Sequence, residues 1–323
     1  MIINTFGIWD GAQTAHIAYV NACMDAYIQD WFSKPILQSL PQRRAVLEFI
    51  TGSRHIIASP YRTDFSCLIA HFEKKFPKKT DLRTKSMQLF KSIFKYEEFS
   101  DKDTIGWNAY RLCEKMKWKV CPYCHIHGTE MAAPDLLDDE YRPQLDHYYS
   151  QSRYPFLGLS LGNLIPCCAQ CNGTGFKHNK NFYLIPHLHP HADNESIRFA
   201  LSITDPSKQD DVLAYNMRDC RELYRITLCV DRDDKKSKNA LKTFKLSSRY
   251  QPYIGHALKI ARDIKRESTN MNQSSRSQMC NQLGLPRDVD VLSFDPNDSE
   301  EYKHAPTGKM ERDIYHASVK RWS

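Results

Sequence analysis

The stretch "IPCCAQCNGTGFK", residues 165–177, puts three cysteines into five positions and follows them with Asn, two glycines and Lys. Two of these cysteines are separated by two residues, and "CPYC" at 121–124 has the same spacing, with 43 residues between the two pairs. A Cys-x-x-Cys knuckle lets both thiolates bind one ion, and two knuckles complete a tetrahedral zinc site without an open position. The sequence therefore predicts one structural zinc ion, bound by Cys121, Cys124, Cys168 and Cys171.

The third cysteine of the stretch, Cys167, does not keep this spacing, so we expect it to pack beneath the knuckle. An alternative interpretation treats the four cysteines as two unrelated buried pairs, but it leaves four partly exposed thiols without a role. A thioredoxin-like redox role for Cys121 and Cys124 fits less well, because no strand precedes this pair to begin the expected fold.

Length and composition indicate a folded protein with a sizeable core: 323 residues, 41% hydrophobic and 26% charged. The first residues lack a basic segment followed by an apolar one, and the sequence contains no run of about 18 apolar residues. We therefore expect neither a secretory signal nor a membrane span, and a cytoplasmic location. In that compartment metal binding and buried thiols explain the eleven cysteines better than disulfides do.

The net charge of +7 is mildly basic; residues 74–85 and 235–245 are dense in lysine, and residues 259–266 add two lysines and two arginines. Such segments suit a polyanionic partner, because they neutralise phosphates. Solvated helix faces explain any single run at least as well. The charge pattern thus supports nucleic-acid binding without establishing it.

Apolar spacing predicts that residues 13 to about 120 are mostly helical, with helices over 13–32, 63–72 and 104–118. The first of these has an apolar stripe that ends at Phe32, and the third has one that begins at Ile105.

Farther along the chain, two alternating apolar segments, 197–203 and 224–230, are predicted strands. Helix returns over 235–265, the polar segment 267–278 is a predicted linker, and 309–322 is a predicted last helix.

Residues suited to phosphodiester hydrolysis lie between and just after the knuckles. The reaction needs a base that activates water and a divalent cation that neutralises charge on the phosphate. A neutral His is the natural base near pH 7, and oxygen ligands from Asp and Asn suit a hard cation such as Mg²⁺. The segment offers these groups in Asp146, His147, Asn163 and Asn172. Candidates for contact with phosphate are Lys177, His178 and Arg153, although plain solvent exposure explains Arg153 equally well.

The order of Asp146-His147, Asn163 and Asn172 around the second knuckle resembles the motif of the HNH endonucleases. The resemblance implies a ββα-metal fold, in which a short hairpin packs on a helix. It implies that His147 is the general base and that Asn163 orients the loop carrying it. It also implies that Asp146 and Asn172 are ligands of the catalytic metal. The last position departs from the family's His, and because Asn disfavours softer metals we expect Mg²⁺ or Mn²⁺.

The likeness extends over roughly residues 104–316, which resemble a subgroup of HNH proteins encoded beside an ABC-type or AAA-type ATPase. That subgroup occurs in bacterial anti-phage systems of the Septu kind and in retron-linked operons. Its members are the nuclease subunits of ATPase–nuclease complexes. The resemblance therefore implies an ATPase partner and a role in antiviral defence.

The predicted fold class is α+β: a mainly helical protein with an inserted zinc-stapled ββα-metal (HNH) core and a small β element. We expect a helical N-terminal region at 1–103, available for partner docking, and the nuclease core at 104–185. A strand pair plus helix packed on the core follows at 186–266, then a polar linker and C-terminal helix at 267–323. The predicted function is metal-dependent endonucleolytic cleavage of DNA or RNA.

Some alternatives stay open at this point. Adjacent residues on an ideal strand point to opposite faces, so the strand must bend or end for Asp146 and His147 to meet one phosphate. The segment "HLHPH", 187–191, is either a second metal site or, because prolines interrupt it, a loop over the active site. The alternative function is a non-catalytic zinc-ribbon module that binds nucleic acid or a partner. Such a module has no use for the Asp146, His147 and Asn172 side chains together.

Overall fold

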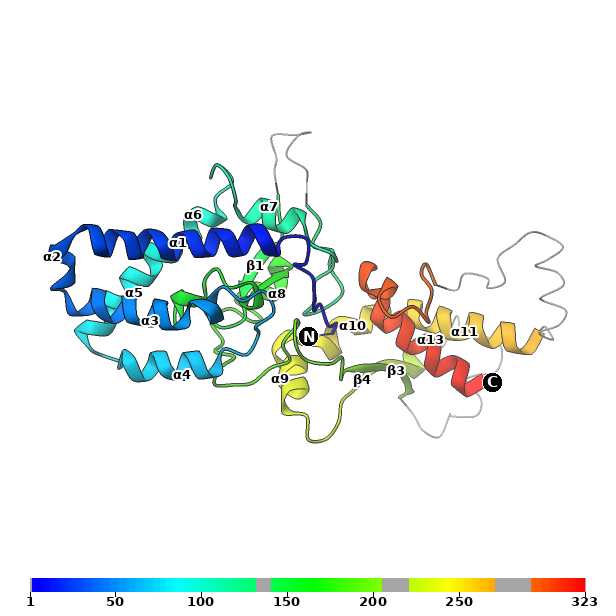
Figure 1. Ribbon diagram of the computed structural model, residues 1–323. Helices are drawn as coiled ribbons and strands as arrows, with labels where there is room; N and C mark the ends of the chain where they lie inside the picture. The colour runs from blue at the N-terminus through cyan, green and yellow to red at the C-terminus, as the bar shows by residue number, and fades with distance from the viewer. Residues whose placement is uncertain (1, 132–140, 205–220, 271–291, 323) are drawn as a thin grey trace. The chain divides into compact units, whose positions relative to one another are not determined.

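A computed structural model describes residues 2–131, 141–204, 221–270 and 292–322 of the chain (Figure 1). The chain forms two compact units. Unit 2 comprises Asn4–Pro122 and Gly128–Asp193, and unit 1 comprises Met1–Ile3, Tyr123–His127 and Asn194–Ser323.

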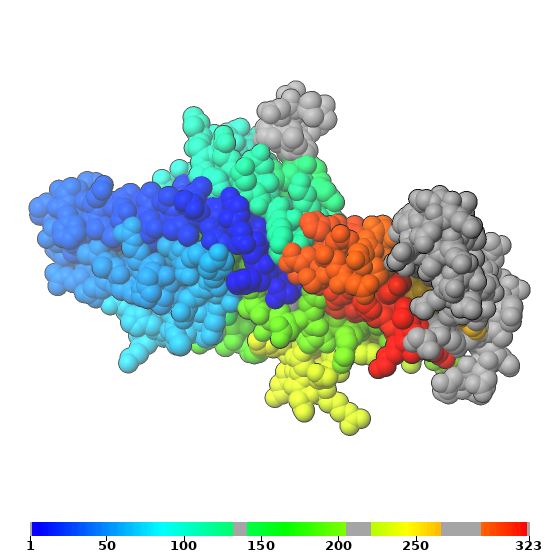
Figure 2. All heavy atoms as spheres, turned by 45° about the vertical axis from the view of Figure 1, so that its right-hand side comes forward, coloured from blue at the N-terminus to red at the C-terminus, as the bar shows by residue number. Residues whose placement is uncertain are grey.

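The first part of unit 2 is helical. Its helices are α1 (Gln13–Ser33), α2 (Pro35–Gln38), α3 (Pro41–Ile57), α4 (Ser66–Lys75), α5 (Asp81–Phe94), α6 (Tyr96–Ser100) and α7 (Ala109–Glu114). Helix α1 runs beside α3, and α5 packs against both (Figure 1). In the space-filling view these N-terminal helices form one closely packed block of atoms (blue to cyan, Figure 2).

The helix predicted over 13–32 is confirmed as α1. Its buried side chains are His16, Val20, Met24, Tyr27 and Trp31. The predicted stripe is wrong at its end, because the Phe32 side chain is 69% exposed. The helix predicted over 63–72 is confirmed as α4, displaced by a few residues. Its apolar side chains at helical spacing are buried throughout: Phe65, Leu68, Ile69 and Phe72.

The helix predicted over 104–118 is shorter, because α7 spans only Ala109–Glu114. Gly106 has a φ of +92°, which lies outside the helical range. The Asn108 side chain then caps the helix, since its Oδ1 accepts hydrogen bonds from two backbone N–H groups of the first turn, both at 3.1 Å. The helix therefore begins after the glycine, and Ile105 is 98% exposed instead of lying on an apolar stripe.

A two-stranded sheet follows the helices. β1 (Gln144–His147) and β2 (Leu164–Cys167) pair antiparallel, with Asp146 opposite Ile165 and His147 opposite Leu164. The chain between them forms the 3₁₀ turns η1 (Pro155–Leu157) and η2 (Leu161–Asn163). At Gly162 a Cβ would lie 1.7 Å from the main-chain oxygen of Arg62, so this close approach of two backbones requires glycine. After β2 the chain forms α8 (Ala169–Asn172), a single helical turn.

Aromatic rings join the turn η1 to the N-terminal helices. Phe156 of η1 is fully buried and packs on Phe49 of α3, Phe72 of α4 and Phe90 of α5. The ring centroids are 5.0, 4.7 and 5.8 Å from that of Phe156. Aromatic pairs at such distances add about 0.5–1.5 kcal/mol each beyond the burial of their area. The helices and the segment between β1 and β2 therefore share one hydrophobic core.

Unit 1 contains the second sheet and the last helices. β3 (Arg198–Ile203) and β4 (Tyr224–Cys229) pair antiparallel, which confirms both predicted strands. The region predicted as helix over 235–265 forms α9 (Lys235–Phe244), α10 (Leu246–Tyr250) and α11 (Ile254–Asn270). Lys245 adopts a left-handed φ of 49°, which ends α9. Two further elements are η6 (Glu301–His304) and α13 (Gly308–Trp322), and α13 confirms the predicted last helix. The predicted linker begins inside α11, and its remainder lies outside the described residues.

The mainly helical α+β class is confirmed, since helices dominate the described residues and the strands form small two-stranded sheets. The compact units divide the chain differently from the predicted segments, because the N-terminal helices and most of 104–185 lie in the same unit. The shared aromatic core around Phe156 is the physical reason. Among the described helices, none combines the length and the apolar character that a membrane crossing requires.

Replacing Phe156 by Ala should destabilise unit 2 strongly. The ring is fully buried against three others, and such truncations in a core cost about 3–5 kcal/mol. Urea unfolding followed by far-ultraviolet circular dichroism should show the loss. Phe32→Ala is the matched control, because its ring is 69% exposed and a surface change of this kind costs less than about 0.5 kcal/mol. Equal effects of the two changes would contradict a shared core.

His16 of α1 is held as a neutral imidazole. Its Nε2 donates to the main-chain oxygen of Leu159 at 2.7 Å, and its Nδ1 accepts a hydrogen bond from Trp107 Nε1 at 3.1 Å. Burial lowers the pKa of His16 to about 4, because the imidazolium would lose its hydration. A second ring proton would also displace the Trp107 hydrogen bond.

This imidazole should make folding stability fall in mild acid. The unfolded chain binds the proton below about pH 6.5, whereas the folded chain binds it only near pH 4, so stability declines as the pH falls through this window. Urea midpoints measured between about pH 7 and about pH 5 should show the decline. His16→Gln keeps one donor and one acceptor but does not titrate, so its decline should be smaller. An equally steep decline in the variant would exclude His16 as a source.

Candidate functional site

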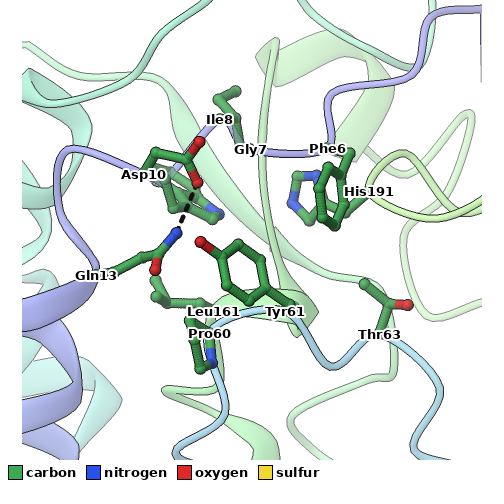
Figure 3. Close-up of a pocket in the computed structure, with 12 residues that line it drawn as sticks. Phe6, Gly7, Ile8, Asp10, Gln13, Pro60, Tyr61, Thr63, Leu161 and His191 are labelled. Carbon is green, nitrogen blue, oxygen red and sulfur yellow. Dashed lines mark hydrogen bonds between the residues drawn. The ribbon is translucent and has the colours of Figure 1, made fainter.

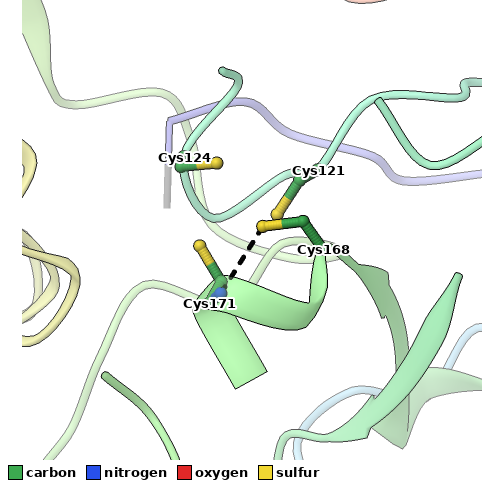
Figure 4. A group of neighbouring side chains, drawn as sticks. All are labelled: Cys121, Cys124, Cys168 and Cys171. Atoms are coloured by element: carbon green, nitrogen blue, oxygen red, sulfur yellow. Dashed lines mark hydrogen bonds between the residues drawn. The ribbon is translucent and has the colours of Figure 1, made fainter. Parts of the chain in front are cut away.

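The four cysteines of the two knuckles converge on one point (Figure 4). The sulfurs of Cys121, Cys124, Cys168 and Cys171 all lie within 4.8 Å of one another. Cys168 precedes α8, and its Sγ accepts a hydrogen bond from the Cys171 N–H at 3.4 Å. A tetrahedral zinc ion with Zn–S bonds of about 2.3 Å holds its sulfurs about 3.8 Å apart. The cluster is therefore suited to a structural metal such as zinc.

Cys167 lies outside this cluster although it adjoins Cys168 in the sequence. It is the last residue of β2, is fully buried, and pairs with Gln144 across the sheet. Burial raises the pKa of its thiol well above the usual value, so the thiol stays neutral. We interpret Cys167 as a packing residue.

Asp146 is buried and paired with Lys177. The Lys177 ammonium lies 2.6 Å from Asp146 Oδ1 and 2.6 Å from the main-chain oxygen of His147. The exposed fractions of the Lys177 and Asp146 side chains are 2% and 4%. The ammonium also lies 5.0 Å from the centre of the Phe182 ring. This placement corrects the sequence-based role of Lys177, because a buried ammonium that donates to Asp146 is not presented to a phosphate.

His147 is half-buried and has a different set of neighbours. Its Nε2 lies 2.9 Å from the main-chain oxygen of Gly158. Because a carbonyl oxygen only accepts, Nε2 carries the proton and Nδ1 has the lone pair. The ring packs edge-on against Tyr96 of α6, with centroids 4.4 Å apart. Burial lowers the pKa of His147 to about 4, so the imidazole is neutral at pH 7.

Asp146 and His147 are adjacent, so the strand must bend or end for both side chains to reach one phosphate. β1 ends at His147, and the contacts of Asp146 and His147 lead to separate neighbours, as alternation on a strand predicts. Lys177 holds the carboxylate, whereas Gly158 and Tyr96 hold the imidazole. A common site for both groups therefore stays a prediction.

Asn163 ties down the loop that follows His147. It is fully buried, and its Oδ1 accepts from the Tyr149 N–H at 2.7 Å. Its Nδ2 donates to the main-chain oxygens of Tyr149 at 3.1 Å and Leu157 at 3.0 Å. Both amide hydrogens are thus used, so the side chain fixes the backbone before η1 and at the last residue of η1. This geometry suits a residue that orients the loop beside the imidazole.

The remaining predicted residues are less enclosed. Asn172 ends α8, and its Nδ2 donates to Gln144 Oε1 at 2.8 Å. Gln144 and Asp146 share a face of β1, because they are two residues apart. His178 and Arg153 are exposed, and their contact with phosphate stays a prediction.

The segment 187–191 packs on the residue after His147. The Tyr148 hydroxyl donates to the main-chain oxygen of His187 at 2.7 Å, and its ring lies 4.1 Å from that of His189. His191 Nε2 donates to the main-chain oxygen of Leu164 at 3.0 Å. Within the described ranges, the groups of three or more His, Cys, Asp or Glu ligands include no histidine of this segment. We therefore interpret 187–191 as a structural loop.

Sequence reasoning missed the two groups that hold His147. Gly158 contributes only its main-chain oxygen, which any residue carries, so no pattern could identify it. Tyr96 belongs to α6, far from β1 in the sequence, and its aromatic ring has no spacing relation to the motif. Only the packing of unit 2 brings these groups to the imidazole.

Two cavities of unit 2 lie elsewhere. One is a small pocket beside Gly162, in which Gln13 Nε2 donates to Asp10 Oδ1 at 2.6 Å and the Phe6 and Tyr61 rings lie close together (Figure 3). Its free volume of about 20 Å³ holds roughly one water molecule. The other is a groove of about 370 Å³ lined mainly by α1 and α5. Neither contains a candidate catalytic residue.

The resemblance assigns a catalytic Mg²⁺ or Mn²⁺ to Asp146 and Asn172. Such ions take oxygen ligands, keep several waters and need few protein groups, so the donor chemistry fits. The electrostatics fit less well, because the Lys177 ammonium already neutralises Asp146. Among the described residues, the cysteine cluster is the group of three or more His, Cys, Asp or Glu ligands that converges.

Comparisons with known proteins returned no match: not among protein-family models, not among curated proteins and not among solved structures. The geometry above and the resemblance in the motif therefore carry the functional argument.

Replacing Cys171 by Ser should remove the bound structural metal, whereas Cys167→Ser should keep it. Cys171 belongs to the cluster and Cys167 does not, although both are buried on adjoining elements. Metal content after purification, measured by inductively coupled plasma mass spectrometry, should fall from one zinc ion per chain to a small fraction of that in Cys171→Ser. Zinc loss in Cys167→Ser together with retention in Cys168→Ser would show that the second knuckle uses the other register.

Proposed function

We propose that the chain is a metal-dependent endonuclease of the HNH type that cleaves phosphodiester bonds in DNA or RNA. The observation that carries this proposal is the state of His147, a neutral imidazole whose Nε2 is fixed on Gly158. Among the described residues, none forms a hydrogen bond with its Nδ1, which is the nitrogen that can accept a proton. The sheet of β1 and β2 and the directly following α8 support a ββα-metal core around it.

In the proposed reaction, Nδ1 of His147 accepts a proton from the attacking water. Nε2 keeps its own proton, which it donates in the hydrogen bond to the main-chain oxygen of Gly158. The packing against Tyr96 holds the ring in this direction. Asn163 fixes the backbone behind the ring through Tyr149. Bound Mg²⁺ or Mn²⁺ would neutralise charge on the phosphate and the leaving oxygen, and Asp146 and Asn172 are the residues proposed to hold it.

Helix α9 is the surface that we propose for the nucleic-acid backbone. Residues 235–245 contain five lysines and no carboxylate, and all five lysines are exposed. The lysine-rich segment 74–85 is different, because several of its cations are paired within the fold, such as Lys75 with Glu48 at 2.7 Å. That segment is explained by solvated helix faces, whereas the exposed lysines of 235–245 lie in a segment without carboxylates and are suited to contact phosphates.

A partner ATPase of the ABC or AAA type, and a role in antiviral defence, are proposed on the resemblance of residues 104–316 alone. The helices of the region 1–103 expose apolar side chains, including Phe32 and Ile36, that a partner would cover. Cleavage assays therefore need to be run with and without the partner.

The alternative function is a non-catalytic zinc module that binds nucleic acid or a partner. The buried pair of Asp146 and Lys177 favours it, because this pair satisfies the carboxylate without a divalent ion. In that interpretation His147 is a packing residue on Tyr96.

Replacing His147 by Ala should lower the rate of cleavage by at least about 10²-fold, because the proton acceptor is lost. Cleavage of plasmid, single-stranded DNA and tRNA would be measured with Mg²⁺ or Mn²⁺ in the presence of the partner. His55→Ala is the matched control, since it removes an exposed imidazole of α3 and should leave the rate unchanged.

Zinc content measured on the same samples shows whether the fold around the cluster persists. A His147→Ala variant that retains zinc and the full rate of cleavage would overturn the proposal. Absence of cleavage by the unaltered chain on all three substrates, with no Mn²⁺ bound at Asp146, would favour the zinc module.

A further inference from the structure

The buried ammonium of Lys177 supplies the positive charge that the buried carboxylate of Asp146 requires. A buried carboxylate is strongly unfavourable unless a positive group pairs with it, and the ammonium lies 2.6 Å from Asp146 Oδ1. The proposed function assigns the same carboxylate to a divalent metal ion. The Lys177 ammonium and the proposed divalent ion would therefore bind the same carboxylate, that of Asp146.

The backbone of Lys177 is placed by the cysteine knuckle. Its N–H donates to the main-chain oxygen of Cys171 at 3.1 Å, and its own main-chain oxygen accepts from the Lys180 N–H at 2.9 Å. The side chain then crosses to the end of β1, where it also donates to the main-chain oxygen of His147. The start of the side chain is thus fixed, whereas the ammonium is carried on a flexible four-carbon stem.

We propose that Lys177 is the resident cation of Asp146, a positioning residue whose ammonium competes with a divalent ion for the carboxylate. The inference rests on the proposed function, since the ion is the one that Asp146 would hold for catalysis. A divalent ion enters this site when the ammonium moves aside. The apparent affinity for the ion is therefore reduced by the fraction of molecules in which Lys177 occupies the carboxylate.

Competition makes a prediction that a purely structural role does not. If Lys177 only shapes the site, removing it disturbs Asp146 and metal binding weakens or stays the same. If Lys177 competes, removing its charge leaves a buried carboxylate in need of a cation, and binding of a divalent ion becomes tighter. The sign of the change in affinity distinguishes the two roles.

The experiment is a Mn²⁺ titration of the zinc-loaded chain, with free Mn²⁺ measured by electron paramagnetic resonance and no nucleic acid present. Lys177→Met removes the charge and keeps an unbranched side chain, and it should lower the dissociation constant by at least about tenfold. The matched control is Lys180→Met, which removes an exposed ammonium three residues away and should leave the constant unchanged. The double change Lys177→Met with Asp146→Asn should abolish the gain.

Stability provides a second measurement, because Lys177→Met leaves a buried carboxylate without its cation. The variant should unfold at a lower temperature than the unaltered chain, and Mn²⁺ should raise its midpoint more than that of the unaltered chain. Lys177→Arg keeps a cation and should bind Mn²⁺ as weakly as the unaltered chain.

Unchanged or weaker Mn²⁺ binding by Lys177→Met, with no extra stabilisation by Mn²⁺, would overturn the inference. Neither measurement uses a substrate, so a chain that failed to cleave nucleic acid would still give the answer. Failure of competition and failure of the nuclease proposal are therefore distinguishable.

Discussion

The four cysteine sulfurs within 4.8 Å of one another could hold a structural metal such as zinc, and a cation there would offset the strong mutual repulsion of thiolates at that separation. For the residues around such a cluster, the free energy of metal binding is also free energy of folding. Helix α8 has four residues, far fewer than a helix needs to be stable by itself. Its position depends on Cys168 and Cys171, which stand at its start and within its only turn.

The segment that follows the cysteine cluster also fixes side chains of β1. Lys177 is bonded through its N–H to Cys171 and through its ammonium to Asp146, and Asn172 is bonded to Gln144. The polar side chains on one face of β1 are therefore held by the segment that follows the second knuckle. The imidazole of His147 is held instead by the turn η1 and by α6. The position of the carboxylate thus depends on the segment that carries the second cysteine knuckle, whereas that of the proposed base depends on the aromatic core of unit 2.

This division explains how much the sequence could predict. Periodicity predicted α1, α4, β3 and β4, because each buries one face and the pattern of apolar residues follows directly. Spacing alone predicted the cysteine cluster, because two-residue knuckles have few other uses. The predictions were wrong at Ile105, because a glycine with positive φ and a capping Asn begin α7 later. They were also wrong at Lys177, because lysine is usually exposed and its burial follows from a carboxylate that comes close only in the folded chain.

For His147 and Asn163, the sequence could predict the residues but not the hydrogen bonds that fix them. Their types and order in the sequence made them candidates, but the tautomer of the imidazole follows from the Gly158 carbonyl, which no sequence pattern reveals. For Asn163, three hydrogen bonds to the backbone explain why an amide is needed at this position. A carboxylate there would lose both donors and a hydroxyl would supply only one.

The environment that keeps His147 neutral also weakens it as a base. With a pKa of about 4, the imidazole is neutral at pH 7 and its Nδ1 has a free lone pair, but that nitrogen accepts a second proton poorly, since a general base works best with a pKa near the working pH. Asp146 raises the pKa of His147 and Lys177 lowers it, so the ammonium acts against the effect of the carboxylate. In the proposed function, a bound phosphodiester would add negative charge beside the ring, which would favour the imidazolium and raise the pKa of His147. In the proposed mechanism the base would therefore become stronger with its substrate bound, and withdrawal of the Lys177 ammonium from Asp146 would act in the same direction.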